Sequence, residues 1–174
     1  TPAELRKALE AMGEKPFRAG QIFKWLHTPV SSFDEMNNLS KDLRARLAEQ
    51  FTLTVPKIQR KQVSAQDGTV KYLWQMQDGD CVESVLMRYA HGNTVCVSTQ
   101  VGCRMGCKFC ASGLFGLKRN LSAGEILDEV LFTEKDSGQK VSNIVLMGTG
   151  EPLDNYENVL KFLHLVSCKE GINI

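Results

Sequence analysis

Long apolar runs are absent from this sequence: no stretch approaches the roughly 18 apolar residues that a membrane-spanning helix needs. The N-terminal residues lack the basic-then-apolar pattern of a secretory signal. Charge of one sign is also scarce, with a net charge of +1 at pH 7, so nothing global forces a nucleic-acid or membrane partner. Internal repeats and low-complexity tracts are missing as well. These absences predict a globular, cytoplasmic protein with no membrane partner.

The first part of the chain, residues 1–53, predicts a small helical domain. Thr1 and Glu4 form a capping box, with Pro2 at the first helical position. Further helices are expected over residues 17–27 and from an N-cap at Ser40. The side chains expected to face the core are Leu5, Ala8, Leu9, Met12, Ile22, Trp25, Leu26, Leu43, Leu47 and Phe51. The basic residues of this domain either contact RNA phosphates or form an ordinary solvated face, and the second alternative is favoured by the acidic residues interspersed among them.

The next part, residues 54–92, predicts a β-meander. Alternating polarity marks strands over residues 57–66, 69–77 and 81–89, and a fourth strand over 94–100. Their joints contain Asp67-Gly68, Asp78-Gly79 and Gly92-Asn93, which are typical turn pairs. The fourth strand is expected to lead directly into a cysteine-rich loop.

Residues 93–174 alternate strand and helix signals, as in a β/α barrel or a doubly wound sheet. A capping box at Ser122 and Glu125 opens a helix that ends near Gly138, and a buried parallel strand is expected over 143–147. The next helix, 156–168, is expected to bury Val159, Leu160, Leu163 and Val166. Residues 171–174 are expected to begin another strand, whose open edge favours self-association. The predicted fold class is α/β: a helical domain and a meander that lead into a partial, truncated barrel.

Three cysteines, Cys103, Cys107 and Cys110, lie in one glycine-containing loop, the cysteine loop (residues 102–113). Its glycines permit tight wrapping, so we expect the three thiolates to turn toward one metal centre. A closed zinc site needs a fourth ligand, and no second Cys or His pair has suitable spacing. An iron-sulfur cubane held by three thiolates leaves one iron open to a substrate. A disulfide or three ordinary buried thiols are the alternatives, although the lack of a secretory signal favours a reducing compartment.

A second motif follows the expected strand 143–147, in the glycine loop (residues 148–152). Its glycines let a ligand approach the backbone closely, and Glu151 can accept hydrogen bonds from an ammonium group. Alone, this signal is weak, because glycine-rich turns after strands are common.

Together these motifs resemble those of the radical S-adenosylmethionine (SAM) superfamily and, more closely, the RlmN family of RNA adenine-C2 methyltransferases. The resemblance is carried by residues 96–103 (CVSTQVGC), 106–110 (GCKFC) and 143–155 (NIVLMGTGEPLDN). Thr149 departs from the Gly-Gly-Glu-Pro-like element of the superfamily. A related enzyme that methylates C8 of the same adenine shares much of this pattern and remains the alternative.

The resemblance implies a [4Fe-4S] cluster held by Cys103, Cys107 and Cys110, and S-adenosyl-L-methionine bound through Gly150 and Glu151. Reductive cleavage of SAM would supply a radical, since adenine C2 is too electron-poor for polar methyl transfer. Residues 93–174 would then be the N-terminal part of a radical SAM core.

The same resemblance assigns two catalytic positions. Glu83 matches a proton acceptor beside the target base, and Cys96 matches a cysteine that resolves a protein–RNA adduct by forming a disulfide with a methyl-carrying cysteine near the C-terminus. Without the resemblance, they read as an exposed strand residue and a buried strand thiol. The implied partners are 23S rRNA, tRNA and an external electron donor, and the intact enzyme is expected to be a monomer.

Four cations, Arg104, Lys108, Lys118 and Arg119, fall between Cys103 and Asn120 with no acid among them. They either steer RNA toward the cluster or offset its thiolate charge. A complete barrel needs about six strand–helix units, and this chain supplies about two, with no counterpart of the methyl-carrying cysteine. We therefore expect an inactive fragment. A non-catalytic RNA-binding module and a zinc-binding regulator are the competing functions.

Overall fold

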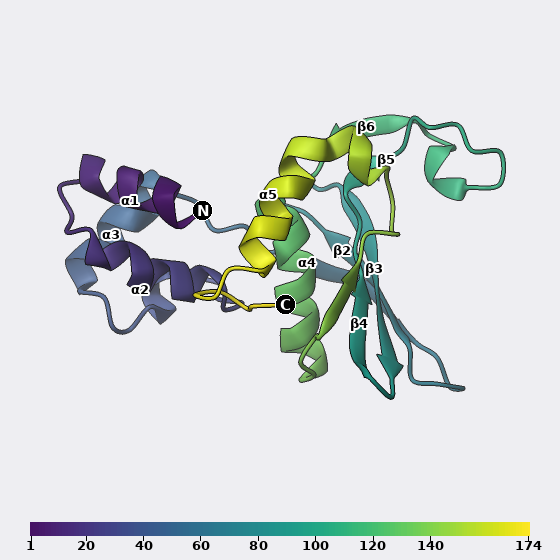
Figure 1. Ribbon diagram of the computed structural model, residues 1–174, viewed down its shortest axis with the longest axis horizontal. Helices are drawn as coiled ribbons and strands as arrows, with labels where there is room; N and C mark the ends of the chain where they lie inside the picture. The colour runs from purple at the N-terminus through teal and green to yellow at the C-terminus, as the bar shows by residue number, and fades with distance from the viewer.

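The computed structural model describes all 174 residues, and it places a helical unit beside a mixed sheet that two further helices cover (Figure 1). The helical unit contains α1 (Pro2–Ala11), α2 (Phe17–Leu26), the 3-10 turn η1 (Phe33–Glu35) and α3 (Lys41–Gln50). The strands are β1 (Lys57–Val63), β2 (Val70–Gln75), β3 (Cys81–Tyr89), β4 (Gly92–Cys96), β5 (Gln100–Gly102), β6 (Leu117–Asn120) and β7 (Asn143–Val145). The remaining helices are η2 (Ala111–Gly113), α4 (Ala123–Ser137), η3 (Pro152–Asn155) and α5 (Tyr156–Val166).

Local capping sets the helix starts, as expected from the sequence. The Thr1 hydroxyl accepts the amide of Glu4 at 3.3 Å, and the Ser40 hydroxyl accepts the amide of Leu43 at 3.2 Å. The small core of this unit consists of Leu9, Ala19, Ile22, Val30, Met36, Leu39, Leu43 and Leu47. Six expected core residues differ: Leu5, Ala8, Met12, Trp25 and Leu26 are only half-buried, and Phe51 is 39% exposed. Phe51 lies outside the core because α3 ends at Gln50 and the chain continues in an extended conformation.

The expected meander is confirmed: β1, β2, β3 and β4 pair in antiparallel order. Strand β7 then adds to β4 in parallel, with Val145 opposite Cys96, so the sheet is mixed in the order β1-β2-β3-β4-β7. Strand β7 is half-buried rather than buried, because it forms the edge of this sheet.

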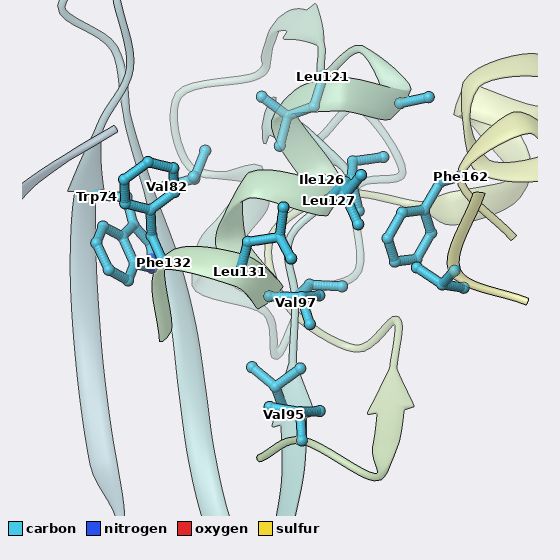
Figure 2. Packing of buried hydrophobic residues seen from close by; sticks show 14 of the residues in the cluster. Trp74, Val82, Val95, Val97, Leu121, Ile126, Leu127, Leu131, Phe132 and Phe162 are labelled. Carbon is cyan, nitrogen blue, oxygen red and sulfur yellow. The ribbon is translucent and has the colours of Figure 1, made fainter. Parts of the chain in front are cut away.

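Helices α4 and α5 cover one face of the sheet (Figure 1). Leu127, Leu131 and Phe132 of α4 pack among sheet residues such as Trp74 and Val95 (Figure 2). This core of 21 buried residues leaves the opposite face of β3 and β4, which carries Glu83 and Cys96, free of helices.

The path into the cysteine loop differs from the expected one. Strand β4 ends at Cys96, and a separate strand, β5, leads into the loop and pairs with β6 in a two-stranded antiparallel sheet. Strand β6 gave no strand signal in the sequence, because it has only four residues and two of them are charged.

Two expectations near the end of the chain are wrong. Residues 171–174 form a turn rather than a strand, because Asn173 has a φ of 56° and the amide of Ile174 donates to the carbonyl of Val166. In α5, Leu160 and Leu163 are 38% and 45% exposed. The side chains of α5 that face the core are Val159, Phe162, Leu165 and Val166.

None of the helices has the length and the apolar character that a membrane-spanning segment needs.

Candidate functional site

The cysteine loop projects from the body of the molecule between β5 and β6 (Figure 1). Its base is closed by the amide of Cys103, which donates to the carbonyl of Gly116 at 3.1 Å. Cys103 is buried, whereas Cys107 and Cys110 are exposed, and all three thiols are free. The amide of Cys110 donates to the carbonyl of Cys107 at 3.0 Å, which forms a tight turn between the two exposed thiols.

The donor types of this loop fit an iron-sulfur cluster, but the described geometry does not gather them. No group of three or more His, Cys, Asp or Glu side chains lies close enough to hold a metal ion. The expectation that three thiolates turn toward one point is therefore not met in this structure. The chemistry of the donors nevertheless suits a cluster, since hydrogen bonds from the Ser112 side chain, the Ser112 amide and the Gly113 amide lower the pKa of the Cys110 thiol.

The glycine loop packs tightly on the strand residues that precede the cysteine loop. A Cβ atom on Gly148 would lie 2.6 Å from the carbonyl oxygen of Val97. Gly150 has a φ of 107°, and a Cβ there would lie 2.6 Å from the Cβ of Gln100. Both positions require glycine, so this loop is more than an ordinary turn.

Hydrogen bonds hold the glycine loop against the segment that contains Ser98, Thr99 and Gln100. The Thr149 carbonyl accepts the amide of Thr99 at 2.9 Å, and the Thr149 amide donates to the Ser98 hydroxyl at 2.9 Å. The Glu151 amide donates to the side-chain oxygen of Gln100 at 2.8 Å. The carboxylate of Glu151 accepts the amide of Leu153 at 3.1 Å, which orients it at the start of η3.

A hollow of about 690 Å³, which we call the site hollow, joins three of the sequence motifs. Its lining residues are Cys81, Glu83, Val101, Gly102, Ala111, Ser112, Phe115, Gly116, Leu117, Lys118 and Thr149. Strand β3, the cysteine loop and the glycine loop therefore meet at one surface. Of the predicted site residues, only Glu83 lines the hollow.

Glu83 and Cys96 lie on the same face of the sheet. Cys96 is paired with Val85, which is two residues beyond Glu83 on β3. The carboxylate of Glu83 pairs with the ammonium of Lys71 at 2.7 Å on the neighbouring strand. Burial raises the pKa of the Cys96 thiol, and the nearby carboxylate of Glu129 raises it further, so this thiol is protonated at neutral pH.

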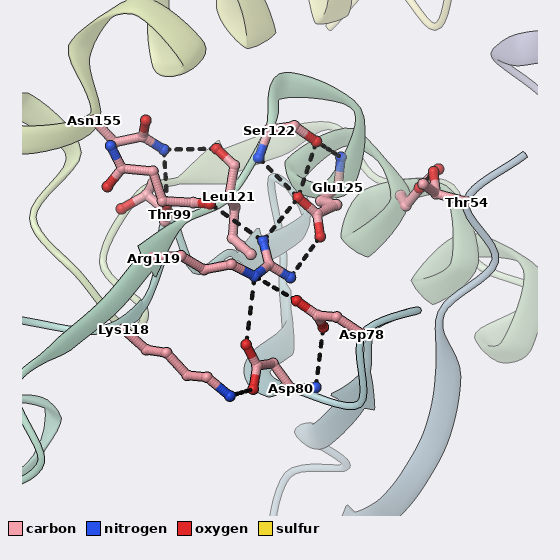
Figure 3. A network of polar contacts seen from close by, with 12 residues as sticks. Thr54, Asp78, Asp80, Thr99, Lys118, Arg119, Leu121, Ser122, Glu125 and Asn155 are labelled. Atoms are coloured by element: carbon pink, nitrogen blue, oxygen red, sulfur yellow. Dashed lines mark hydrogen bonds and ion pairs between the residues drawn. The ribbon is translucent and has the colours of Figure 1, made fainter. Parts of the chain in front are cut away.

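Three of the four cations between Cys103 and Asn120 form ion pairs with acids from other parts of the chain. Lys118 pairs with Asp80, and Arg119 pairs with Asp78 at 2.6 Å and with Glu125 at 2.8 Å (Figure 3). Arg104 pairs with Asp154 in η3, where its Nε donates at 2.9 Å. Of the four cations, only Lys108 forms no ion pair, and the other three are paired with acids.

Sequence reasoning missed a buried acid beneath the site. Glu129 of α4 is 0% exposed; one carboxylate oxygen accepts the amide of Ser98 at 3.1 Å, and the other has no partner. Burial raises the pKa of Glu129 well above its usual value. The helical spacing could have predicted this burial, because Glu129 falls three residues after Ile126 on the side of α4 that faces the core.

Two family profiles match most of this chain. Residues 1–53 match the ribosomal RNA large subunit methyltransferase N-terminal domain, and residues 97–174 match the radical SAM superfamily. A "probable dual-specificity RNA methyltransferase RlmN" of Lachnoclostridium phytofermentans is 55% identical over 100% of this chain and 49% of its own. A protein of the same name from Desulforamulus reducens is 57% identical over 99% of this chain and 49% of its own.

A solved structure agrees with these relatives. The crystal structure of a radical SAM methyltransferase from Sphaerobacter thermophilus superposes with a TM-score of 0.88 at 42% identity. The match covers 100% of this chain and 52% of that one. The chain thus spans about half the length of the relatives that it matches.

Proposed function

Because this chain belongs to the RlmN family of radical SAM methyltransferases, we propose that it supplies the cluster-binding and cofactor-binding part of an RNA methyltransferase. The proposed reaction adds a methyl group to C2 of an adenine in 23S rRNA and in tRNA. The partners in this proposal are RNA and an external electron donor.

In this proposal the chain has three working parts. Residues 1–53 form a helical accessory domain for RNA, residues 54–92 a β-meander, and residues 93–174 part of the radical SAM core. A hydrophobic cluster whose eight buried residues all lie between Leu9 and Leu47 supports the first of these boundaries, although Phe23 of α2 belongs to the cluster beneath the sheet.

The cofactor residues have distinct tasks. Cys103, Cys107 and Cys110 would hold a [4Fe-4S] cluster, and Gly150 and Glu151 would hold the amino group of SAM. When bound, the cluster supplies the electron that splits SAM. The glycine loop fits its task, because its backbone at Gly150 is packed closely against Gln100 and the Glu151 carboxylate is oriented by the amide of Leu153.

Glu83 and Cys96 would act on the base and on the adduct. Glu83 would accept a proton from the adenine, and the Lys71 ammonium at 2.7 Å holds its carboxylate in place on the sheet. Cys96, kept as a thiol by burial, would lose its proton only when it attacks to resolve the protein–RNA adduct.

The observation that carries the proposal is the site hollow. This hollow is lined by Glu83, by Gly102 of the cysteine loop and by Thr149 of the glycine loop. The first and last of these residues are 66 positions apart in the sequence (149 minus 83). A base placed there would lie beside both loops, as a radical transfer between cofactor and RNA requires.

Anaerobic reconstitution with iron and sulfide tests the proposal. The wild-type chain should turn brown, and SAM should change its EPR spectrum. Cys107→Ser should abolish the cluster absorption, whereas the matched variant Cys168→Ser, in a half-buried thiol outside the loop, should retain it.

Two outcomes would contradict the proposal. A colourless protein that contains one zinc would indicate a zinc-binding regulator. An unchanged EPR spectrum with SAM, together with RNA affinity that survives the triple change of Cys103, Cys107 and Cys110 to Ala, would indicate a non-catalytic RNA-binding module.

A further inference from the structure

Gln100, at the start of β5, forms three side-chain hydrogen bonds. It is 0% exposed. Its oxygen accepts the amide of Glu151 at 2.8 Å, and its nitrogen donates to the side-chain oxygen of Asn120 at 2.8 Å and to the carboxylate of Asp154 at 3.0 Å. Both amide protons are therefore used, and the side chain has one preferred orientation.

These bonds join the two loops of the proposed site. Glu151 ends the tight part of the glycine loop, and Asp154 lies in η3 immediately after it. Asp154 also accepts from the guanidinium of Arg104, which follows Cys103 in the cysteine loop. A chain of contacts thus runs from Glu151 through Gln100 and Asp154 to Arg104.

The backbone of Gln100 supports the same loop. Its amide donates to the carbonyl of Thr149 at 3.2 Å, and a Cβ on Gly150 would lie 2.8 Å from its nitrogen. The glycine loop therefore sits directly on Gln100, which leaves little freedom in the position of Glu151.

Other side chains cannot replace this amide. Glutamate has no donor for Asn120 or Asp154, and it would place a second carboxylate beside Asp154. Methionine has a similar length and shape but satisfies none of the three partners, and the Glu151 amide would lose its acceptor.

We propose that Gln100 is a positioning residue: it fixes Glu151 and the glycine loop at a set distance and orientation from the cysteine loop. This inference rests on the proposed function for its consequence in SAM binding, but the positioning itself is a property of the chain without any cofactor.

The test compares wild type with Gln100→Met and with the matched surface variant Gln139→Met, in an exposed position after α4. Residue-resolved hydrogen exchange by NMR should show the Glu151 amide exchanging about tenfold faster in Gln100→Met. The amide of Leu131, inside α4, should keep its wild-type rate in both variants.

Calorimetric titration of SAM into the reconstituted proteins gives the second readout. Gln100→Met should retain the cluster absorption but bind SAM about tenfold more weakly, whereas Gln139→Met should match wild type. Unchanged exchange at Glu151 would overturn the positioning role, and unchanged SAM affinity would overturn its consequence for the cofactor. If wild type itself binds no SAM, the proposed function fails while the exchange result still decides the positioning role.

Asp154→Ala provides a second variant if Gln100→Met does not fold, because the Asp154 side chain is 12% exposed at the edge of the site. It leaves the bond between Gln100 and Glu151 but removes the link to Arg104. Exchange of the Arg104 Nε proton, which donates to Asp154 in wild type, should accelerate while exchange of the Glu151 amide keeps its wild-type rate. An unchanged rate at Arg104 Nε, or a faster rate at the Glu151 amide, would overturn the proposed chain of contacts.

Discussion

Two neighbouring acids of α4, Asp128 and Glu129, show how single residues couple this protein to pH. The carboxylate of Asp128 accepts a hydrogen bond from the hydroxyl of Thr54, which joins the segment after α3 to α4. Asp128 also lines a hollow of about 370 Å³ between the helical unit and α4. Burial raises the pKa of Asp128 to about 7, and the charge of Glu125 adds to the shift.

Asp128→Asn should flatten the dependence of stability on pH. A raised pKa in the folded state stabilises the fold fully below the ordinary value of 3.8, and this contribution is lost as pH rises through about 7. The loss is on the order of 4 kcal/mol at most, since one pH unit is worth about 1.4 kcal/mol. Urea unfolding of both proteins at several pH values between 4 and 8 measures it. Equal dependence of the unfolding free energy on pH in wild type and Asp128→Asn would contradict the role of Asp128. The control is Glu10→Gln, on the exposed surface of α1, which should keep the wild-type dependence.

Glu129→Gln should stabilise the protein at alkaline pH. Glutamine keeps an acceptor for the Ser98 amide and cannot ionise, so it removes the cost of a charge at a fully buried position. The free energy of unfolding of Glu129→Gln should exceed that of wild type at pH 8, and the difference should shrink as pH falls toward 4.5, the ordinary pKa of glutamate. A variant that is less stable than wild type at pH 8 would show that the ionised carboxylate is favourable there.

At the scale of elements, the hairpin of β5 and β6 depends on one glycine. Gly102 has a φ of 75°, and a Cβ there would lie 2.0 Å from the carbonyl oxygen of Gly116. Both the backbone conformation and the close approach exclude a larger side chain. Gly102 therefore allows the two ends of the cysteine loop to approach each other closely.

Gly102→Ala should therefore destabilise the protein by at least about 1–3 kcal/mol. Gly20→Ala in α2 is the matched control: nothing lies within 4 Å of its Cβ position, and alanine should stabilise the helix by roughly 0.5–1 kcal/mol. Chemical denaturation followed by circular dichroism compares the two. Equal changes in the free energy of unfolding for Gly102→Ala and Gly20→Ala would show that the hairpin does not need a glycine with positive φ at position 102.

Element boundaries were predictable where the signal is local. The capping box of Ser122 and Glu125 opens α4, and Gly138 ends it with a φ of 65°. The pairing of β5 with β6 was not predictable, because a four-residue segment with two adjacent cations carries no strand signal until Gly102 and Gly116 bring the strands together. The burial of α5 was misjudged, since its apolar residues are not confined to one side of the helix and only packing against α4 buries Phe162 and leaves Leu163 exposed.

At the scale of the whole molecule, the helical unit has its own small core but is joined to the core beneath the sheet, to which Phe23 of α2 belongs. Leu5 packs against both hydrophobic clusters, and Lys161 of α5 pairs with Glu4 of α1 at 2.7 Å. The sheet contains a single parallel pair, β4 and β7, whereas a closed barrel of this kind needs about six such strands.

The 174-residue chain should therefore produce no methylated RNA by itself. The site face of the sheet has no further strands to enclose SAM and exclude water from a radical. Incubation with 23S rRNA or tRNA, SAM and a reductant, followed by mass spectrometry of the nucleosides, measures this, with a full-length relative as the positive control. Detectable 2-methyladenosine from the 174 residues would contradict the prediction, and 8-methyladenosine would in addition reassign the modified carbon.

The sequence by itself determined the helices, the meander, the family motifs and the chemistry that they imply. These depend on neighbours within a few positions: caps, turn pairs, and the spacing of Cys103, Cys107 and Cys110. Tertiary structure alone decided which charges are neutralised, because the partners of Arg104 and Lys118 lie 50 and 38 positions away. It also decided that Gln100 joins the two loops, since buried hydrogen bonds form between residues that only folding brings together.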